Sequence, residues 1–126
     1  MAKFLIRGRY SGGSWARMIA RRDDRTLAVR ALMDSFGGSL DALYWEVETA
    51  AAYALVDLPD TVAAAAVVTA ISKSGAFVGV EVHELLSQSQ LNDVLVLAGD
   101  AAKVYKVPGY AAVGAVEDGV SSDGAG

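Results

Sequence analysis

The sequence has no cysteine, and this absence excludes disulfide bonds, thiolate catalysis and cysteine-based zinc sites. It also lacks a phosphate-binding loop, a dinucleotide-binding glycine fingerprint, a Ser-His-Asp spacing and a zinc motif. The single histidine, His83, leaves few strong ligands for a transition metal. We therefore expect no metal site and no cofactor.

Positive charge is scarce as well, because 15 Asp and Glu residues outnumber 11 Lys and Arg and give a net charge of −4. A nucleic-acid partner needs a basic face, so we expect none. The longest apolar run, residues 62–71, is too short and too rich in alanine to cross a bilayer. Lys3, Arg7 and Arg9 interrupt the apolar N-terminus, unlike a signal peptide. We expect a bacterial-type cytoplasmic protein that does not bind membranes.

Hydrophobic residues are abundant, at 53% of the chain. A chain of 126 residues has a large surface for its volume, so part of this apolar surface is expected to meet a partner. We predict that the partner is a second copy, in a homodimer or a larger homo-oligomer.

Hydrophobic periodicity predicts four strands and four helical segments. The strands are expected at residues 3–10, 40–49, 52–58 and 77–86, and the helices at residues 14–22, 25–36, 62–73 and 88–102. The predicted N-caps are Ser14, Asp60 or Thr61, and Ser87, and Asp23 and Asp24 are predicted as the cap and first-turn residues of the second helix. This order predicts an α+β fold, a ferredoxin-like βαββαβ antiparallel sheet with helices on one face plus a C-terminal helix. We place this domain at residues 1–105 and a Gly/Ala-rich tail at residues 106–126, with residues 121–126 disordered.

Side-chain alternation divides each strand between a helix-covered face and an open face. The covered set is Phe4, Ile6, Leu43, Trp45, Val47, Ala54, Val56, Val78, Val80 and Val82. Phe77, Gly79 and Leu85 fall in the other set, and the open face also receives Arg7, Arg9, Tyr44, Glu46, Tyr53, Glu81 and His83. A single β-bulge would reverse part of this assignment.

His83 is the candidate for proton transfer, or for metal ligation together with Glu81 on the same strand face. The alternative is a partly exposed histidine at an interface. Arg7 and Arg9 are candidates for binding a carboxylate or phosphate, or else they pair with Glu46, Glu48 or Glu81 across strands.

Four aromatic residues are candidates for shaping a pocket for a small anionic or aromatic ligand. Tyr10 and Trp15 flank the Gly12-Gly13 loop, and they either wall a pocket or belong to the core. Tyr44 and Tyr53 either donate phenol hydrogen bonds to a ligand or pack across strands.

Several stretches resemble the GYD-domain family: the opening MAKFLIRG at residues 1–8, AVRAL leading to Gly37-Gly38, and VDLPD at residues 56–60 before an alanine-rich helix. The resemblance covers residues 1–91. It implies a ferredoxin-like fold and a similarity to dimeric α+β barrels, in which two sheets face each other. The namesake Gly-Tyr-Asp stretch is not retained, because Ala50 and Ala51 stand at its tyrosine and aspartate positions.

Two functional hypotheses remain open at this point. The first is a homo-oligomeric small-molecule-binding protein with its site on the open face. By analogy with α+β barrels, it could be a cofactor-independent oxygenase or isomerase. The second is a non-enzymatic assembly protein whose open face only makes subunit contacts. Paired charges on the open face favour the second hypothesis, and an accessible cavity holding His83 and Arg7 favours the first.

Overall fold

The computed structural model describes residues 1–109 of the chain. The described residues divide into two compact units, Met1–Leu85 and the part that begins at Leu86. The first unit contains β1 (Ala2–Tyr10), α1 (Gly12–Ala20), α2 (Arg25–Ser35), β2 (Ser39–Trp45), β3 (Ala52–Leu58), α3 (Thr61–Lys73) and β4 (Phe77–Leu85).

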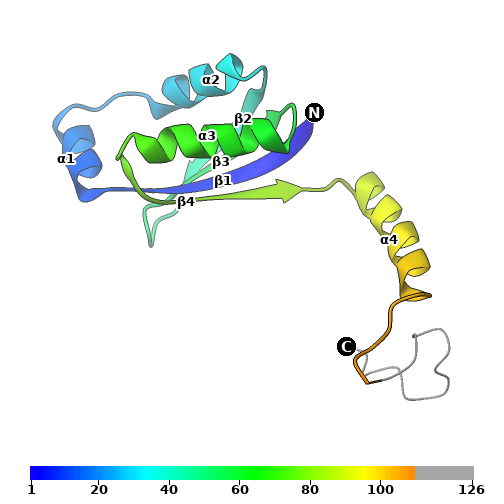
Figure 1. Cartoon of the computed structure of the whole chain (residues 1–126). Coiled ribbons are helices and arrows are strands. Elements are labelled where there is room, and N and C mark those ends of the chain that lie inside the picture. Colours follow the sequence, from blue (N-terminus) through cyan, green and yellow to red (C-terminus); the bar gives the residue numbers. More distant parts are fainter. Residues whose placement is uncertain (110–126) are drawn as a thin grey trace. The chain divides into compact units, whose positions relative to one another are not determined.

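The four strands of the first unit form one antiparallel sheet in the order β2-β3-β1-β4. Figure 1 shows α2 and α3 side by side over one face of this sheet, which leaves the opposite face open. This arrangement confirms the predicted ferredoxin-like α+β fold.

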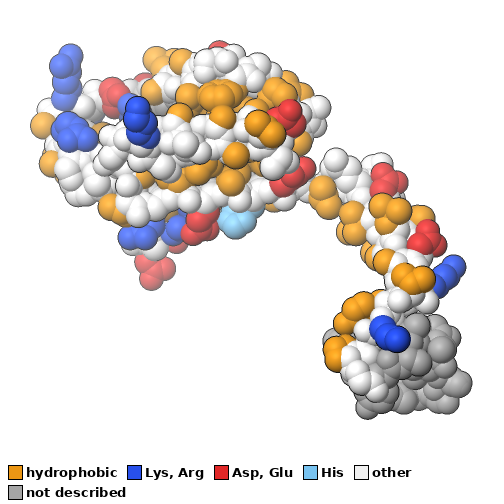
Figure 2. All heavy atoms as spheres, viewed as in Figure 1, with side chains coloured by type: hydrophobic (Ala, Val, Ile, Leu, Met, Phe, Trp, Pro, Cys, Tyr) orange, Lys and Arg blue, Asp and Glu red, His pale blue; other side chains and the backbone are white. Residues whose placement is uncertain are grey.

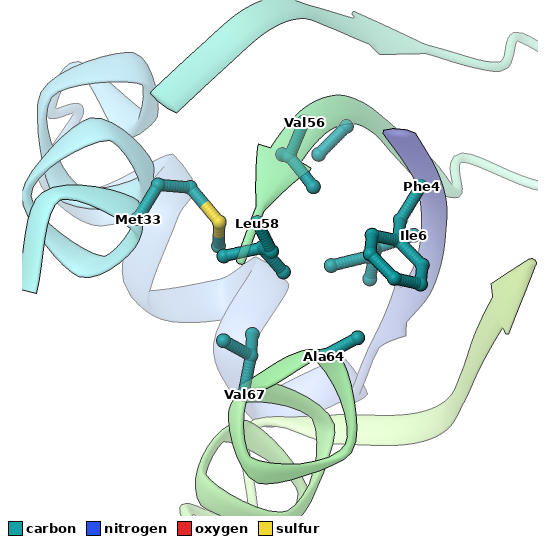
Figure 3. Close-up of a cluster of buried hydrophobic side chains, with 8 residues drawn as sticks. Phe4, Ile6, Met33, Val56, Leu58, Ala64 and Val67 are labelled. Atoms are coloured by element: carbon teal, nitrogen blue, oxygen red, sulfur yellow. The ribbon is translucent and has the colours of Figure 1, made fainter. Parts of the chain in front are cut away.

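The core lies between the sheet and these two helices (Figure 3). Phe4 on β1 and Val56 on β3 are fully buried and point toward the helices, as their strand alternation requires. Met33 of α2 and Val67 of α3 meet them from the other side. The buried Ala64 of α3 is small, and this lets the helix approach the sheet closely.

A β-bulge in β4 reverses part of the predicted face assignment. Arg9 pairs with Gly79, but Tyr10 pairs with Phe77, so Val78 is an extra residue in the ladder. The bulge places Phe77 on the covered face, where its ring lies over Gly8, and leaves the Val78 side chain 59% exposed. The prediction that groups Val78 with the covered valines and Phe77 with the open set is wrong for this reason.

Several boundaries also differ from the prediction, and the largest difference is at the end of the second strand. The second strand ends at Trp45 rather than residue 49, because a turn closes with a hydrogen bond from the Glu46 amide to the Ala51 carbonyl. Val47 therefore lies in the turn, fully exposed. The N-cap of α1 is Ser11, not Ser14: the Ser11 hydroxyl accepts from the Ser14 amide, and Ser14 is buried in the first turn.

The second unit contains α4 (Gln88–Ala102), whose bounds agree with the prediction. Ser87 caps it, and the Gln90 side chain accepts from the Ser87 amide in return, so a capping box fixes the helix start. The division of the chain at residues 105/106 stays a prediction. The predicted disordered end, residues 121–126, lies outside the described residues.

Candidate functional site

Arg7 occupies the middle of the open face, because β1 is a central strand of the sheet. Its register partners are Tyr53 on β3 and Glu81 on β4. In Figure 2 the single histidine, in pale blue, lies beside acidic and basic side chains on this uncovered face. The structure therefore brings together Arg7, Tyr53, Glu81 and His83, as the strand alternation predicts.

The guanidinium of Arg7 is held by a closed set of hydrogen bonds. Its Nε donates to the Tyr53 hydroxyl at 2.9 Å, and its Nη2 donates to Thr49 Oγ1 at 3.3 Å. Both hydroxyls then donate to Oε1 of Glu46, each at 2.8 Å. The Glu46 and Glu81 carboxylates also lie 3.7 and 3.6 Å from the Arg7 nitrogens. One cation is thus flanked by two carboxylates.

These contacts shift two pKa values in the directions that favour the ion pair. The hydrogen bond from Tyr53 lowers the pKa of Glu46, and Thr49 and Arg7 add to that effect. The hydrogen bond to Tyr53 also raises the pKa of Arg7, with smaller contributions from the Glu81 and Glu46 charges. Both side chains are therefore charged near neutral pH, and each stabilises the other's ionised form.

Lys3 forms a second group of the same kind at the far end of β1. It pairs with Asp41 and, at 3.0 Å, with Asp57, its register partner on β3. The hydrogen bond with Asp41, followed by that with Asp57, raises the pKa of Lys3. Asp41 reaches Lys3 from a register shift in β2 between Leu40 and Ala42.

His83 lies on β4 opposite Leu5, with Nε2 3.2 Å from Oε1 of Glu81. Both side chains are more than half exposed. Within residues 1–109, no group of three or more His, Asp or Glu side chains is arranged to hold a metal ion. Neither His83 nor Glu81 borders any of the cavities that Tyr10, Trp15 or Ile6 line on the covered side.

The other two open-face candidates are exposed. Tyr44 is the register partner of Tyr53 and is 71% exposed. Arg9 lies opposite Gly79 and makes no ion pair with any residue in the described part of the chain.

Tyr10 and Trp15 lie elsewhere, on the covered side of the sheet. Tyr10 stacks on Phe77 at 4.4 Å and on Trp45 at 5.7 Å between ring centroids. Trp15 packs edge-on against Tyr10 and Trp45. The predicted site residues therefore form two groups on opposite faces of the sheet.

Sequence analysis missed several members of these two groups. Thr49 lies in a turn where strand alternation no longer assigns a face. Phe77 is displaced by the bulge, and Arg25, at the start of α2, borders the aromatic group. The alternation of Ile6, Gly8 and Tyr10 was a usable signal that Tyr10 faces the helices.

The sheet order and the helices on one face define a ferredoxin-like α+β protein, and its open face carries paired charges. The family model described as GYD domain matches residues 4–95, so the chain belongs to the GYD domain family. No curated protein and no solved structure matches the chain. None of the helices in residues 1–109 is long and apolar enough to span a membrane.

Ala50 and Ala51, where the sequence resemblance predicts the family's tyrosine and aspartate, have distinct surroundings. Ala50 has a φ of 57°, a left-handed conformation that costs a non-glycine residue about 1 kcal/mol. Ala51 is completely buried, and its carbonyl accepts the turn-closing hydrogen bond from Glu46. A carboxylate at position 51 would need a partner that the alanine does not.

Proposed function

We propose that this protein is a homo-oligomeric assembly protein in which two copies pair through their open sheet faces. The observation that carries the proposal is an apolar row between two rows of paired charges. Ala42, Leu55 and Leu5 form this central row across β2, β3 and β1, and the polar His83 of β4 ends it. The Lys3 group flanks it on one side and the Arg7 group on the other.

The apolar row has no helix over it in the first unit. Leu5 and Leu55 are partly exposed, and Leu85, opposite Lys3 on the same face, is 37% exposed. An apolar centre with a polar rim is the usual anatomy of a subunit interface. An antiparallel sheet with helices on one face can leave the other solvated, but three leucines there favour a covering partner.

The charges on this face favour a second copy as the covering partner. Lys3 and Arg7 each carry two carboxylate neighbours, so each group has one acid in excess. Arg9, on the same face, has no ion-pair partner in the described part of the chain. In a two-fold pair, Arg9 of each copy can therefore meet an excess carboxylate of the other copy.

The same pairing argues against Arg7 as an anion-binding residue. An incoming carboxylate would have to compete with Glu46 and Glu81 at a guanidinium that already donates to two hydroxyls. In the proposed pair, Arg7, Tyr53, Glu81 and His83 are contact residues, and Tyr44 adds an aromatic surface to them.

Sedimentation velocity over a concentration series tests the proposal with a matched pair of leucine variants. Leu55→Lys puts a charge in the apolar row, whereas Leu27→Lys makes the same change on the outer surface of α2, where Leu27 is 63% exposed. We expect the wild type and Leu27→Lys to form dimers or larger species and Leu55→Lys to sediment as a folded monomer.

A second measurement locates the interface. In a mixed sample of one isotope-labelled and one unlabelled copy, intermolecular NOEs are expected to the Leu5 and Leu55 methyl groups. A wild type that stays monomeric at every concentration, or intermolecular NOEs confined to other surfaces, would refute the proposal.

A further inference from the structure

A groove with a volume of about 640 Å³ lies between α1 and the beginning of α2. Figure 1 shows α1 at the end of the sheet where β1 ends and β4 begins, and in Figure 2 Lys and Arg side chains project from this end of the first unit. Arg17 and Arg21 border the groove from α1 and its C-cap, and Asp23 and Arg25 border it from the connection to α2 and the first residue of that helix. None of the open-face residues borders this groove.

Arg17 and Arg21 lie on one face of α1. They are one helical turn apart, at positions i and i+4, and Ser14 and Met18 border the groove from the same face. Cβ atoms at this spacing are about 5–6 Å apart, so both guanidinium groups can contact a single headgroup in the groove. Two like charges at this spacing also destabilise a helix slightly, and a bound anion removes that repulsion.

The two aspartates nearest to these arginines in the sequence are engaged elsewhere. Asp24 caps α2 by accepting from a backbone amide of its first turn at 2.9 Å, and it does not border the groove. Asp23 borders the groove but pairs with Arg25 at 2.9 Å. Within residues 1–109, neither Arg17 nor Arg21 forms an ion pair. The groove therefore carries two positive charges that no carboxylate of the described residues balances.

A short chain of hydrogen bonds holds Arg17 in place. Its Nη2 donates to Oγ of the buried Ser14 at 3.2 Å, and this Oγ donates to the Ala76 carbonyl at 2.9 Å. Arg17 itself is exposed, and its other side-chain N–H groups have no partner among the described residues. A ligand can therefore reach these N–H groups, and it meets a guanidinium whose position is already fixed, which lowers the entropic cost of binding.

Apolar side chains border another part of the groove. Met18 and Ala20 lie on α1, Ala76 lies directly before β4, and Tyr10 ends β1. The volume of the groove falls within the range of small-molecule sites, which is about 300–1,000 Å³. The groove thus offers cations for an anionic headgroup and an apolar surface for a small organic substituent.

We propose that this groove binds a small organic phosphate monoester, with the phosphate on Arg17 and Arg21 and the organic part against Met18, Ala76 and Tyr10. The planar N–H donors of a guanidinium match the oxygens of a phosphate, and two guanidinium groups balance its double negative charge. A monocarboxylate would balance only one of the two charges. The site goes beyond the proposed assembly function and does not depend on subunit pairing.

Phenyl phosphate is the probe. Phenyl sulfate is the matched comparator, because it has the same ring and a tetrahedral headgroup with one negative charge instead of two. At about pH 7.5 a phosphate monoester is mainly dianionic, since its second pKa is about 6. Isothermal titration calorimetry measures the affinity, and NMR shifts of the α1 amides and the Met18 methyl group locate the site. We expect saturable binding of phenyl phosphate that weakens as the ionic strength rises, and at least about fivefold weaker binding of phenyl sulfate.

Two double variants remove the same charge from the same segment of the chain. Arg17→Gln with Arg21→Gln removes both unpaired cations of the groove, whereas Arg22→Gln with Arg30→Gln removes two exposed arginines that do not border it. The first should lose at least about tenfold in affinity for phenyl phosphate, and the second less than about twofold. Arg21→Gln alone should lose about fivefold, and it leaves the hydrogen bond between Arg17 and Ser14 intact.

Three results would overturn the inference: no saturable binding of phenyl phosphate to the wild type, equal affinity for the two probes, or equal losses in the two double variants. Thermal melts establish that each variant is folded. The subunit variant Leu55→Lys should bind phenyl phosphate like the wild type, so failure of the assembly proposal and failure of this one are distinguishable.

Discussion

The Tyr53 hydroxyl lies 2.9 Å from Nε of Arg7, its register partner across the β1–β3 ladder. The same hydroxyl donates to Glu46. It therefore positions the Arg7 guanidinium and also stabilises the ionised form of the Glu46 carboxylate. Tyr53 is therefore a structural member of the open-face ion pairs. Its phenol is already engaged as both acceptor and donor within the chain.

Replacing Tyr53 by phenylalanine should raise the pKa of Glu46 toward its ordinary value. The hydrogen bond from Tyr53 is the largest cause of the lowered value, and the phenylalanine ring retains the packing but not the hydroxyl. A carboxyl ¹³C NMR titration of wild type and Tyr53→Phe measures this directly. Tyr44→Phe is the control, since Tyr44 is exposed and opposite Tyr53 but outside the hydrogen-bond set. An unchanged Glu46 titration in Tyr53→Phe would contradict the assigned cause.

Glu46→Gln should remove a pH-dependent part of the stability. The folded pKa of Glu46 lies below its ordinary value of 4.5, so the ionised side chain stabilises the fold above that pH. This contribution is lost as the pH falls through the folded pKa. The wild type should therefore exceed Glu46→Gln in free energy of unfolding near neutral pH, and the gap should close in acid.

Urea unfolding at a series of pH values, with Glu48→Gln as the exposed control in the same turn, checks the Glu46 prediction. If the difference in free energy of unfolding between wild type and Glu46→Gln were the same at all pH values, the effect of the substitution would not come from the charge of Glu46.

Ala50→Gly should stabilise the protein by about 0.5–1 kcal/mol. The left-handed φ of 57° strains an alanine, and relief of that strain outweighs the greater freedom of glycine in the unfolded chain. The same type of change at Ala65, an exposed position within α3, should destabilise by about 1 kcal/mol. Chemical denaturation measures the change in free energy of unfolding for both variants. A gain for Ala50→Gly and a loss for Ala65→Gly would confirm the turn conformation, and equal losses would contradict it.

Gly8→Ala should destabilise the fold by about 1–3 kcal/mol through overpacking. A Cβ on Gly8 would lie 2.7 Å from Cε1 of Phe77, whose ring is stacked on Tyr10 and cannot move away freely. Gly79→Ala is the control on β4, because a Cβ there meets no atom within 4 Å. Phe77→Leu should partly rescue Gly8→Ala, and additive losses in this double-mutant cycle would refute the contact.

Much of the fold follows from local patterns that agree with one another. Alternation in β1 and β3 identifies Phe4 and Val56 as core and Arg7 and Tyr53 as open-face residues, because these strands pair without interruption. The capping box at Ser87 likewise identifies the start of α4. In these segments a local sequence pattern, either strand alternation or a helix cap, is enough to predict which side chains are buried or where the helix begins.

The candidate site was harder to predict because its parts depend on tertiary context. Thr49 reaches Arg7 from a turn, and no periodicity assigns a direction to a turn residue. Phe77 changes face through a bulge that is defined only by pairing with β1. Arg25 looks like one more solvated arginine in the sequence, and its unpartnered Nε emerges only when the helix packs beside Tyr10 and Trp45.

The extra residue at Val78 has a consequence for how this strand can change length during evolution. Phe77 opposite Tyr10 and Gly79 opposite Arg9 would form a regular ladder if Val78 were deleted. Deletion of a residue between Gly79 and His83 would instead move side chains on one side of the gap to the opposite face. Position 78 is therefore where β4 can lose a residue while Phe77 stays over Gly8 and Glu81 stays beside Arg7.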